Sequence, residues 1–320
     1  MKAIVYRGPQ AIRAEEVSDP KLKRGDELIR FRAGSICGTD LHYFKGEWKT
    51  KVGRIIGHDA CGENLRDGEK VAVEPIIRCG KCKFCLTGRY HLCRDGSYMG
   101  MSAQGCFSEI FAAPKENLHR IPENVSFEES AILEPVALAL HTFEMLQPKV
   151  GERAVILGQG PIGLLMTQVA RLCGVKVIAV DRDPHRLEVA KNLGANEIVD
   201  AIMTDSTEAI NDLTNGGAEI VVEAAGSRHT VEQTCKIVAP AGRVALVGAF
   251  TGGMKFDGEA SFFGVETGVG KYPLALQLIS EGKVDVKSLI THVFPLTDFE
   301  EAIKTALDLT KKPLKVVLVT

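Results

Sequence analysis

The chain has 320 residues, 45% hydrophobic and 25% charged, which is an ordinary composition for a soluble globular protein. A single hydrophobic core rarely stabilises a chain of this length, so we expect two domains. A net charge of −2 provides no basic field for nucleic acid or an anionic membrane surface, and no run of about 18 apolar residues predicts a membrane span. The start of the chain lacks the apolar stretch of a signal peptide, so we expect a cytoplasmic protein with nine reduced cysteines.

The first 140 or so residues predict many short strands. Alternating runs such as Glu27–Arg32 and Lys70–Glu74 are separated by turns rich in Gly, Pro and Asp. The sequence therefore predicts a β-rich first domain.

From Arg153 the pattern changes to strands that alternate with helices, which predicts a doubly wound parallel sheet from about 150 to 265. The expected strands are 154–157, 175–180, 197–199, 220–222 and 244–247, the helices are 162–173 and 186–193, and the stretch 230–238 continues the alternation. The tail predicts helices near 274–280 and 299–309 and a last strand at 315–319. A short tail after an inserted α/β unit suggests that the chain returns to the first domain.

A glycine-rich turn follows the first of these strands and opens a helix. Gly158 permits a tight turn, Gly160 lets backbone N–H groups approach a pyrophosphate, and Gly163 permits close packing of helix and strand. An acid about 20 residues further on typically binds the adenine ribose, and an acid favours NAD over NADP. A doubly wound sheet without a ligand is the alternative. The predicted cofactor-binding residues are Gly158, Gly160, Pro161, Ile162, Gly163, Asp181 and Arg182.

Four cysteines with the spacing C-x2-C-x2-C-x7-C predict a closed tetrahedral zinc site with a structural role. They are Cys79, Cys82, Cys85 and Cys93. An iron–sulfur cluster has similar spacing, and two disulfides would need an oxidising compartment.

Three further residues are candidates for a second zinc site: Cys37, His58 and Glu134. No spacing rule connects them. A lone cysteine is usually a small buried residue, a lone histidine is often satisfied in the core, and a glutamate before proline can simply end a strand. The chemistry of the side chains alone leaves the site an open question.

The order of the motifs resembles zinc-containing medium-chain dehydrogenases, above all their sorbitol/polyol and threonine 3-dehydrogenase branches. The matching motifs are Cys-Gly-Thr-Asp-Leu-His at 37–42, Gly-His-Asp at 57–59, the cysteine lobe, Glu134-Pro135 and the turn at 158–163. The resemblance runs nearly end to end. It implies an α/β protein with a GroES-like catalytic domain over 1–145 and 269–320, a zinc lobe at about 79–93, and a Rossmann domain over 146–268.

The resemblance also implies roles for individual residues. Cys37, His58 and Glu134 would bind a catalytic zinc, giving two zinc ions per chain with the cysteine lobe. Asp59 stands where glutamate is usual, and we expect it beside the metal rather than on it. Asp40 would accept a hydrogen bond from His58 and fix its tautomer. Thr39 would take the proton of the substrate hydroxyl and pass it, through the cofactor ribose, to His42 at the surface.

The predicted reaction is the NAD-linked oxidation of a secondary alcohol, a polyol or sugar alcohol, to a ketone. The closest rival is a threonine 3-dehydrogenase, whose branch shares the pair Glu47-Trp48. A zinc-free reductase on the same fold would lack the metal ligands, and a non-catalytic zinc- and nucleotide-binding protein would hold zinc only in the lobe. By analogy with relatives, we expect a homodimer or homotetramer.

Two stretches are shorter than the family pattern. Only Glu63-Asn64-Leu65-Arg66 separates Gly62 from Asp67, and residues 250–263 also look trimmed. The sequence leaves the shape of the substrate pocket undetermined for this reason.

Overall fold

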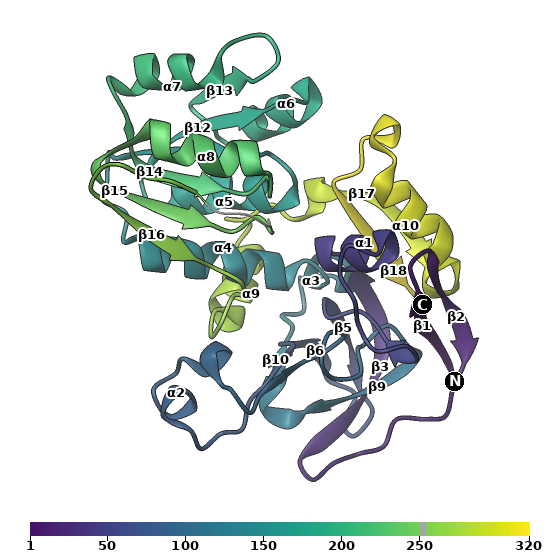
Figure 1. Ribbon diagram of the computed structural model, residues 1–320. Coiled ribbons are helices and arrows are strands. Elements are labelled where there is room, and N and C mark those ends of the chain that lie inside the picture. The colour runs from purple at the N-terminus through teal and green to yellow at the C-terminus, as the bar shows by residue number, and fades with distance from the viewer. Residues whose placement is uncertain (250–253) are drawn as a thin grey trace. The chain divides into compact units, whose positions relative to one another are not determined.

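The computed structural model describes residues 1–249 and 254–320, which form two compact units (Figure 1). The first comprises Met1–Glu134, Tyr272–Gly282 and Val286–Thr320, and the second comprises Pro135–Lys271 and Lys283–Asp285. The domain boundaries proposed from the sequence, at 145–146 and 268–269, remain predictions. Residues 250–253, part of the stretch noted above as short, lie outside the described residues.

The first unit is built on strands, as its alternating sequence predicts. A seven-stranded sheet has the order β10-β6-β5-β3-β18-β17, with β9 also paired to β3, a three-stranded sheet has the order β2-β1-β4, and β7 pairs with β8. The strands are β1 Lys2–Gly8, β2 Ala11–Glu16, β3 Asp26–Ser35, β4 Arg54–Ile55, β5 Ala60–Asn64, β6 Lys70–Val73, β7 Ile76–Ile77, β8 Ser97–Tyr98, β9 Ile110–Pro114, β10 Leu118–Arg120, β17 Ile290–Pro295 and β18 Lys315–Val319.

The tail of the chain returns to the first unit, as the sequence suggested. β18 pairs antiparallel with β3, with Val317 opposite Ser35, and parallel with β17. The hairpin that joins β5 to β6 is short but closed. Asn64 accepts from the backbone N–H of Arg66 through its side chain and from Gly68 through its carbonyl.

The sequence pattern missed the four helices of the first 146 residues, the one-turn helices α2 and α3 and the longer α1 and α4. The possibility that Glu134 ends a strand is wrong, because Glu134 lies in the first turn of α4, where the next residue, Pro135, is tolerated. The helices that include residues of the first unit are α1 Gly38–Lys45, α2 Lys83–Leu86, α3 Phe127–Ser130, α4 Leu133–Leu146, α9 Tyr272–Ser280 and α10 Phe299–Leu307. Most of α4 belongs to the second unit.

The second unit is the predicted doubly wound sheet. Its six strands are all parallel in the order β13-β12-β11-β14-β15-β16, which is that of a dinucleotide-binding fold. Helices α5 and α6 pack against β11–β13, and α7 and α8 pack together against β13–β15 (Figure 1). The elements are β11 Arg153–Leu157, α5 Pro161–Leu172, β12 Lys176–Asp181, α6 Pro184–Asn192, β13 Glu197–Asp200, α7 Ser206–Thr214, β14 Ala218–Glu223, α8 Arg228–Ile237, β15 Val238–Leu246 and β16 Ala260–Gly264.

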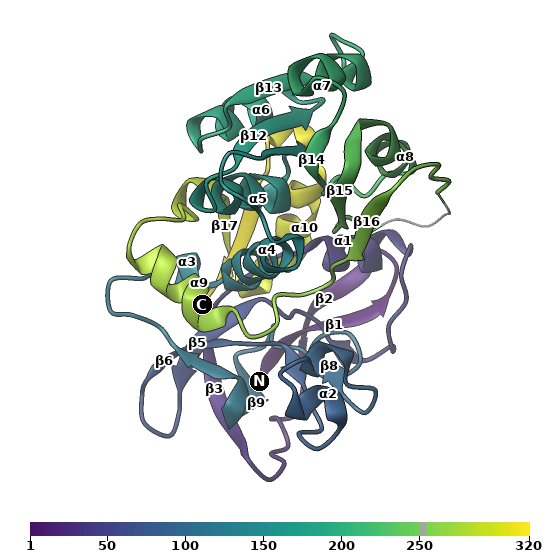
Figure 2. The same cartoon turned by 90° about the vertical axis from the view of Figure 1, so that its left-hand side faces the viewer.

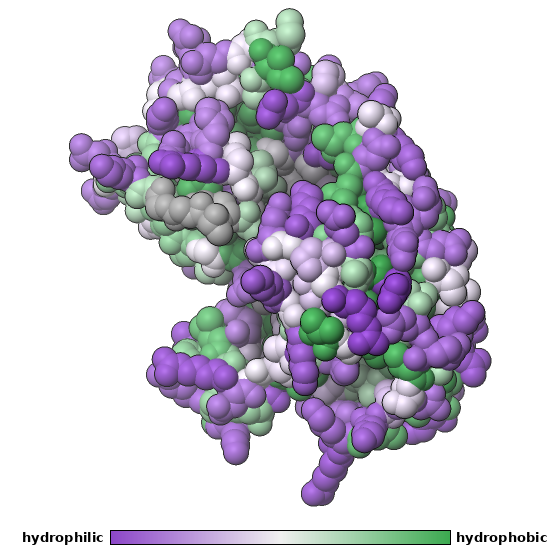
Figure 3. Space-filling model, turned by 45° about the vertical axis from the view of Figure 1, so that its right-hand side comes forward, coloured by the Kyte–Doolittle hydropathy of each residue, from purple (hydrophilic) through white to green (hydrophobic). Residues whose placement is uncertain are grey.

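Each unit has its own hydrophobic core. In the first, the ring of Phe107 lies 6.2 Å from that of Phe31 and 6.1 Å from that of Phe299. In the second, branched residues such as Val155 and Val221 fill the centre of the sheet. No helix among the described residues has the length and apolar character to cross a membrane, and the face in Figure 3 is mainly hydrophilic with scattered apolar groups.

An ion pair ties β11 to β14 and gives the second unit a pH dependence. Arg153 donates to both carboxylate oxygens of Glu219, at 2.8 and 3.2 Å, and lowers the pKa of Glu219 to about 2. An unfolded glutamate titrates near 4.3, so this pair stabilises the fold fully above about pH 5 and is lost as the pH falls toward 2.

We predict that Glu219→Gln lowers the free energy of unfolding by about 1 kcal/mol at pH 7, because both side chains are partly exposed. The difference from the wild type should narrow below about pH 4.5. Urea unfolding followed by far-UV circular dichroism measures it, with the exposed Glu208→Gln as control. A difference that persists undiminished at pH 3 would contradict this assignment.

Candidate functional site

Antiparallel pairing of β3 and β5 brings the first candidate residues together. Gly34 faces Ala60 across the pair, so the chain leaves β3 toward Cys37 at the same edge where His58 and Asp59 enter β5. The backbone N–H of Ser35 donates to the carbonyl of Asp59 at 3.0 Å and closes this edge. Cys37 and His58, 21 positions apart in the sequence, thus become neighbours.

Cys37, His58 and Asp59 form a compact group of possible metal ligands. One donor atom from each lies within 4.8 Å of the others. His58 and Asp59 are buried, and Nε2 of His58 is 3.7 Å from Oδ1 of Asp59. Gly57, which precedes the pair, has φ +89°, and a Cβ there would lie 2.2 Å from the Phe107 ring. Only glycine fits this turn, so Gly57 fixes where His58 stands.

The carboxylate of Asp59 is held from one side only. Its Oδ2 accepts from Ser35 Oγ at 3.0 Å and from the buried ammonium of Lys315 at 3.4 Å. Its Oδ1 is buried and has no hydrogen-bond partner. A buried carboxylate oxygen without a partner is costly in a folded protein, and here it faces a thiol and an imidazole.

The surroundings of His58 favour a positive charge. Burial lowers its pKa, but the charges of Asp59 and Cys37 oppose this effect and raise the pKa to about 10. Burial raises the pKa of nearby Asp40 to about 6. Asp40 does not accept from His58 as expected, because its Oδ2 accepts from the backbone N–H of Cys37 at the start of α1 and its Oδ1 has no partner.

This group fits zinc. A thiolate, an imidazole and a carboxylate are the donor types that zinc takes in proteins, and three protein ligands leave a position open for chemistry. The partnerless Oδ1 of Asp59 and the charge around His58 are the observations that make a cation fit.

Glu134, which the resemblance implied as the third ligand, lies outside this group. It is buried at the start of α4 and lines a small cavity together with Asp59 and Tyr272. Two candidates for proton transfer follow Cys37 on α1. The Thr39 hydroxyl lies 4.0 Å from Cys37 Sγ, and His42 stands one helical turn after Thr39.

The four lobe cysteines form the second group, and their sulfur atoms lie within 4.8 Å of one another. Sγ of Cys85 is 3.5 Å from that of Cys82 and 3.8 Å from that of Cys79. Tetrahedral zinc with bonds near 2.3 Å places sulfurs about 3.8 Å apart, whereas a disulfide needs about 2.05 Å. Backbone N–H groups of Lys81 and Cys82 lower the pKa of Cys79 to about 6, which favours the thiolate.

The lobe around α2 stands out from the rest of the first unit in Figure 1 and faces the viewer in Figure 2. Tyr90 anchors it: its hydroxyl donates to the buried carboxylate of Glu74 at 2.5 Å, and the guanidinium of Arg78 lies over its ring at 4.6 Å. Glu74 also contacts Nε2 of His119 on β10, at 3.1 Å. The lobe is thus attached through one buried carboxylate.

The glycine-rich turn lies between β11 and α5, next to β14, where the strand order of the parallel sheet reverses. Such a switch point is where doubly wound sheets bind ligands. A Cβ on Gly163 would lie 1.8 Å from the Gly158 carbonyl, whereas a Cβ on Gly160 would meet nothing closer than 3.8 Å. Pro161 opens α5 and no side chain caps it, which leaves its first N–H groups for an anion.

Asp181 ends β12 beside this turn. Its carboxylate accepts from the backbone N–H groups of Gln159 at 2.5 Å, Arg182 at 2.7 Å and Asp183 at 2.9 Å. These three bonds fix the carboxylate at the position where the adenine ribose is expected. The predicted cofactor residues therefore converge on one edge of the sheet, with Arg182 adjacent.

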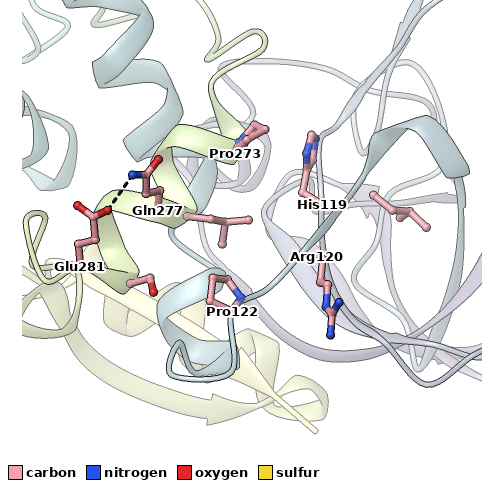
Figure 4. A pocket seen from close by; sticks show the side chains of 9 residues that line it. His119, Arg120, Pro122, Pro273, Gln277 and Glu281 are labelled. Carbon is pink, nitrogen blue, oxygen red and sulfur yellow. Dashed lines mark hydrogen bonds between the residues drawn. The ribbon is translucent and has the colours of Figure 1, made fainter.

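A surface pocket of about 500 Å3 lies apart from these groups, between β10 and α9 (Figure 4). His119 is already engaged by Glu74 and stacks on Tyr272 at 5.0 Å. Gln277 donates to Glu281 at 2.7 Å, as drawn. We assign no chemistry to this pocket.

Sequence reasoning missed Ser35 and Lys315 as supports of Asp59. Lys315 begins a strand that reads as an ordinary buried run, and only the pairing of β18 with β3 brings it near the site. No local signal could have identified it.

Two family matches cover most of the chain. Residues 23–123 match the family described as "Alcohol dehydrogenase GroES-like domain", and residues 161–281 match "Zinc-binding dehydrogenase".

Curated relatives extend the match. The chain is 30% identical to sorbitol dehydrogenase of Bacillus subtilis over 341 positions, covering 99% of this chain and 97% of that protein. It is 33% identical to L-threonine 3-dehydrogenase of Bacillus licheniformis, covering 94% of each. The span of 341 positions exceeds the 320 residues, so this chain carries gaps relative to the first relative.

Solved structures agree in fold. An alcohol dehydrogenase of Escherichia coli CFT073 with NADH superposes with a TM-score of 0.92 at 29% identity, covering 100% of this chain and 99% of that one. A protein described as a zinc-binding dehydrogenase of Sinorhizobium meliloti 1021, bound to NADP, gives the same TM-score, identity and coverage. The present chain therefore belongs to the zinc-dependent medium-chain alcohol and polyol dehydrogenase family, and it is an oxidoreductase of secondary alcohols.

Proposed function

We propose that the chain oxidises a polyol or sugar alcohol to a ketone with NAD, using one catalytic and one structural zinc ion. The observation that carries the proposal is the convergence of Cys37, His58 and Asp59 in a buried group of three different donor types. A non-catalytic zinc- and nucleotide-binding protein would need only the cysteine lobe and the glycine-rich turn. Such a non-catalytic protein would not need a second buried set of metal ligands, one of which has a carboxylate oxygen without a hydrogen-bond partner.

Bound zinc supplies a Lewis acid that lowers the pKa of a substrate hydroxyl, and NAD supplies the hydride acceptor. The chain's own residues then orient and deprotonate. Ser35 and Lys315 hold Asp59, while the Cys37 N–H fixes Asp40 at the start of α1. Thr39, beside Cys37, takes the hydroxyl proton, and His42 passes a proton to solvent from its partly exposed position.

For the third zinc ligand, we propose Asp59, because its carboxylate belongs to the compact group and Glu134 does not. Glu134 adjoins the site across the small cavity shared with Tyr272. The resemblance implied instead that Glu134 binds the zinc and that Asp59 lies beside it. The two assignments predict different zinc contents for variants of these two residues.

NAD rather than NADP follows from Asp181. Its carboxylate is fixed by three backbone N–H groups, so it cannot turn aside to admit a 2′-phosphate. Arg182 follows it in the chain and contributes one of these backbone N–H groups.

Threonine 3-dehydrogenase activity is the second candidate, favoured by the similarity to the B. licheniformis enzyme. The pair Glu47-Trp48, which suggested it, is engaged by His42 in the structure and supplies no separate ligand for an amino acid. We therefore place polyols first.

We also propose a cytoplasmic homodimer or homotetramer. Four of the nine cysteines form the lobe group and Cys37 belongs to the buried group, a use of cysteine as metal ligand that is typical of a reducing compartment. β16 is an edge strand of the parallel sheet, and such edges pair readily with a second copy.

We predict that wild-type protein forms NADH faster with sorbitol or 2,3-butanediol than with L-threonine. Cys37→Ser and His58→Gln should each lower this rate by about a thousandfold, since zinc contributes several kcal/mol to the reaction. Zinc analysis should fall from two ions per chain to one. Cys173→Ser, in the second unit, is the control. Full activity in both ligand variants would sink the proposal.

We predict that Asp59→Asn reduces zinc occupancy at the catalytic site, whereas Glu134→Gln keeps two zinc ions per chain. An amide oxygen is a weaker ligand than a carboxylate, and only Asp59 stands within the group. Zinc content is measured by atomic emission after dialysis. Loss of zinc in Glu134→Gln alone would restore the ligand set implied by the resemblance.

We predict that Asp181→Ser weakens NAD binding. The ratio of the dissociation constant for NADP to that for NAD should fall by about tenfold or more. The change removes the carboxylate that accepts from the ribose and repels a 2′-phosphate. Dissociation constants from NADH and NADPH fluorescence test this without any substrate. Unchanged preference in the variant would place the selectivity elsewhere.

A further inference from the structure

The chain after α1 folds back onto His42. Gly46 has φ +79° and reverses the chain, so that the backbone N–H groups of Glu47 and Trp48 both donate to the His42 carbonyl, at 3.0 and 3.3 Å. A Cβ on Gly46 would lie 2.8 Å from Pro9, so both backbone and space require glycine here. The backbone of one histidine thus holds two following residues in place.

The side chains of the same two residues also return to the His42 ring. Oε2 of Glu47 lies 2.5 Å from Nδ1, and the Trp48 indole stacks on the imidazole with centroids 4.5 Å apart and planes 18° from parallel. Trp48 in turn packs against the core of the first unit. The carboxylate therefore fixes one ring nitrogen, while the indole fixes the plane of the ring.

This arrangement selects one tautomer of neutral His42. A carboxylate only accepts, so Nδ1 must carry the proton, which leaves Nε2 as the free acceptor. The hydrogen bond from His42 lowers the pKa of Glu47, which keeps the acceptor ionised. Lys45, 4.0 Å from the other Glu47 oxygen, is the second charged group at this end of α1. Among the described residues, Glu47 is the one charged side chain within ion-pair distance of the His42 ring.

We propose that Glu47 and Trp48 are positioning residues that hold His42 as the Nδ1–H tautomer, so that Nε2 accepts the proton released during alcohol oxidation. This inference rests on the proposed function, in which His42 carries that proton. Thr39 stands three residues earlier, on the same side of α1. The alcohol hydroxyl gives its proton to the Thr39 oxygen as the Thr39 hydroxyl proton leaves toward Nε2 of His42, so Thr39 ends as a neutral hydroxyl. His42 becomes imidazolium by accepting at Nε2 and returns to neutral by releasing a proton to water.

The competing explanation is that the turn merely caps α1. Both explanations predict lower stability when the turn is damaged, but only the proposal predicts a change in the ring tautomer. The first experiment therefore reads the tautomer directly, in zinc-loaded protein without substrate, by 15N NMR of labelled histidine at a pH where the ring is neutral.

In the wild type, we expect His42 Nδ1 to be protonated and Nε2 bare. In Glu47→Ala, Nε2–H should become the main form, because nothing then holds the proton on Nδ1. Glu47→Gln keeps an acceptor oxygen and should be intermediate. Glu232→Ala is the matched control, since Glu232 is 46% exposed and Glu47 49%, and each bonds one neighbouring side chain on its own surface.

The second experiment measures proton release in a single turnover, using a pH indicator and stopped flow. Glu47→Ala should slow the release about tenfold, the lower end of the effect of losing a partner that orients a histidine. The deficit should shrink as pH rises, because hydroxide then takes the proton directly. KM for alcohol and for NAD should stay within about twofold. Trp48→Phe, which keeps an aromatic ring, should retain more activity than Trp48→Leu.

The proposal is overturned if the Nδ1–H tautomer persists in Glu47→Ala, or if the tautomer changes while proton release keeps its wild-type rate and pH profile. Failure of the proposed function looks different. In that case the wild type itself forms no NADH with any alcohol, whereas the NMR measurement still reports which nitrogen carries the proton.

Discussion

The antiparallel pairing of β3 with β5 is the constraint on which the group of Cys37, His58 and Asp59 depends. It converts two loops into one edge where a thiol, an imidazole and a carboxylate meet, and Gly57 sets the turn that leads into it. β18 then adds Lys315 from the other side of β3. A buried ion pair that loses one partner costs about 3–5 kcal/mol. The charge of Asp59 therefore stabilises the pairing of β18 with β3, which brings Lys315 to it.

In the second unit, glycine residues rather than buried charges determine the geometry of the turn at 158–163. Gly158 and Gly163 allow β11, β14 and α5 to approach closely, and the buried Gln159 side chain pins the turn by donating to the Ile156 carbonyl. The free N–H groups at the start of α5 lie on one side of this turn, and the fixed carboxylate of Asp181 lies on the other. An anion at one end and a ribose at the other suit this pattern.

Sequence periodicity predicted most of the second unit, since buried parallel strands and their helices carry strong local signals. It missed α7, which is a short helix of nine residues, and α4, whose largely apolar sequence lacks a clear amphipathic pattern. The cysteine lobe was predictable from spacing alone. The catalytic group was not, because Cys37, His58 and Glu134 share no spacing rule and the choice between Glu134 and Asp59 depends on side-chain geometry. The role of Lys315 could not be predicted either, because its partner Asp59 lies 256 positions away in the sequence.

That separation has a consequence for how the protein is made. At about 5–20 residues per second, roughly 13–50 s pass on the ribosome between the synthesis of Asp59 and of Lys315. During this interval the carboxylate has no ammonium to neutralise it and β3 lacks one neighbour. The first unit therefore completes its seven-stranded sheet, and the ion pair at Asp59, only after the final strand has been synthesised.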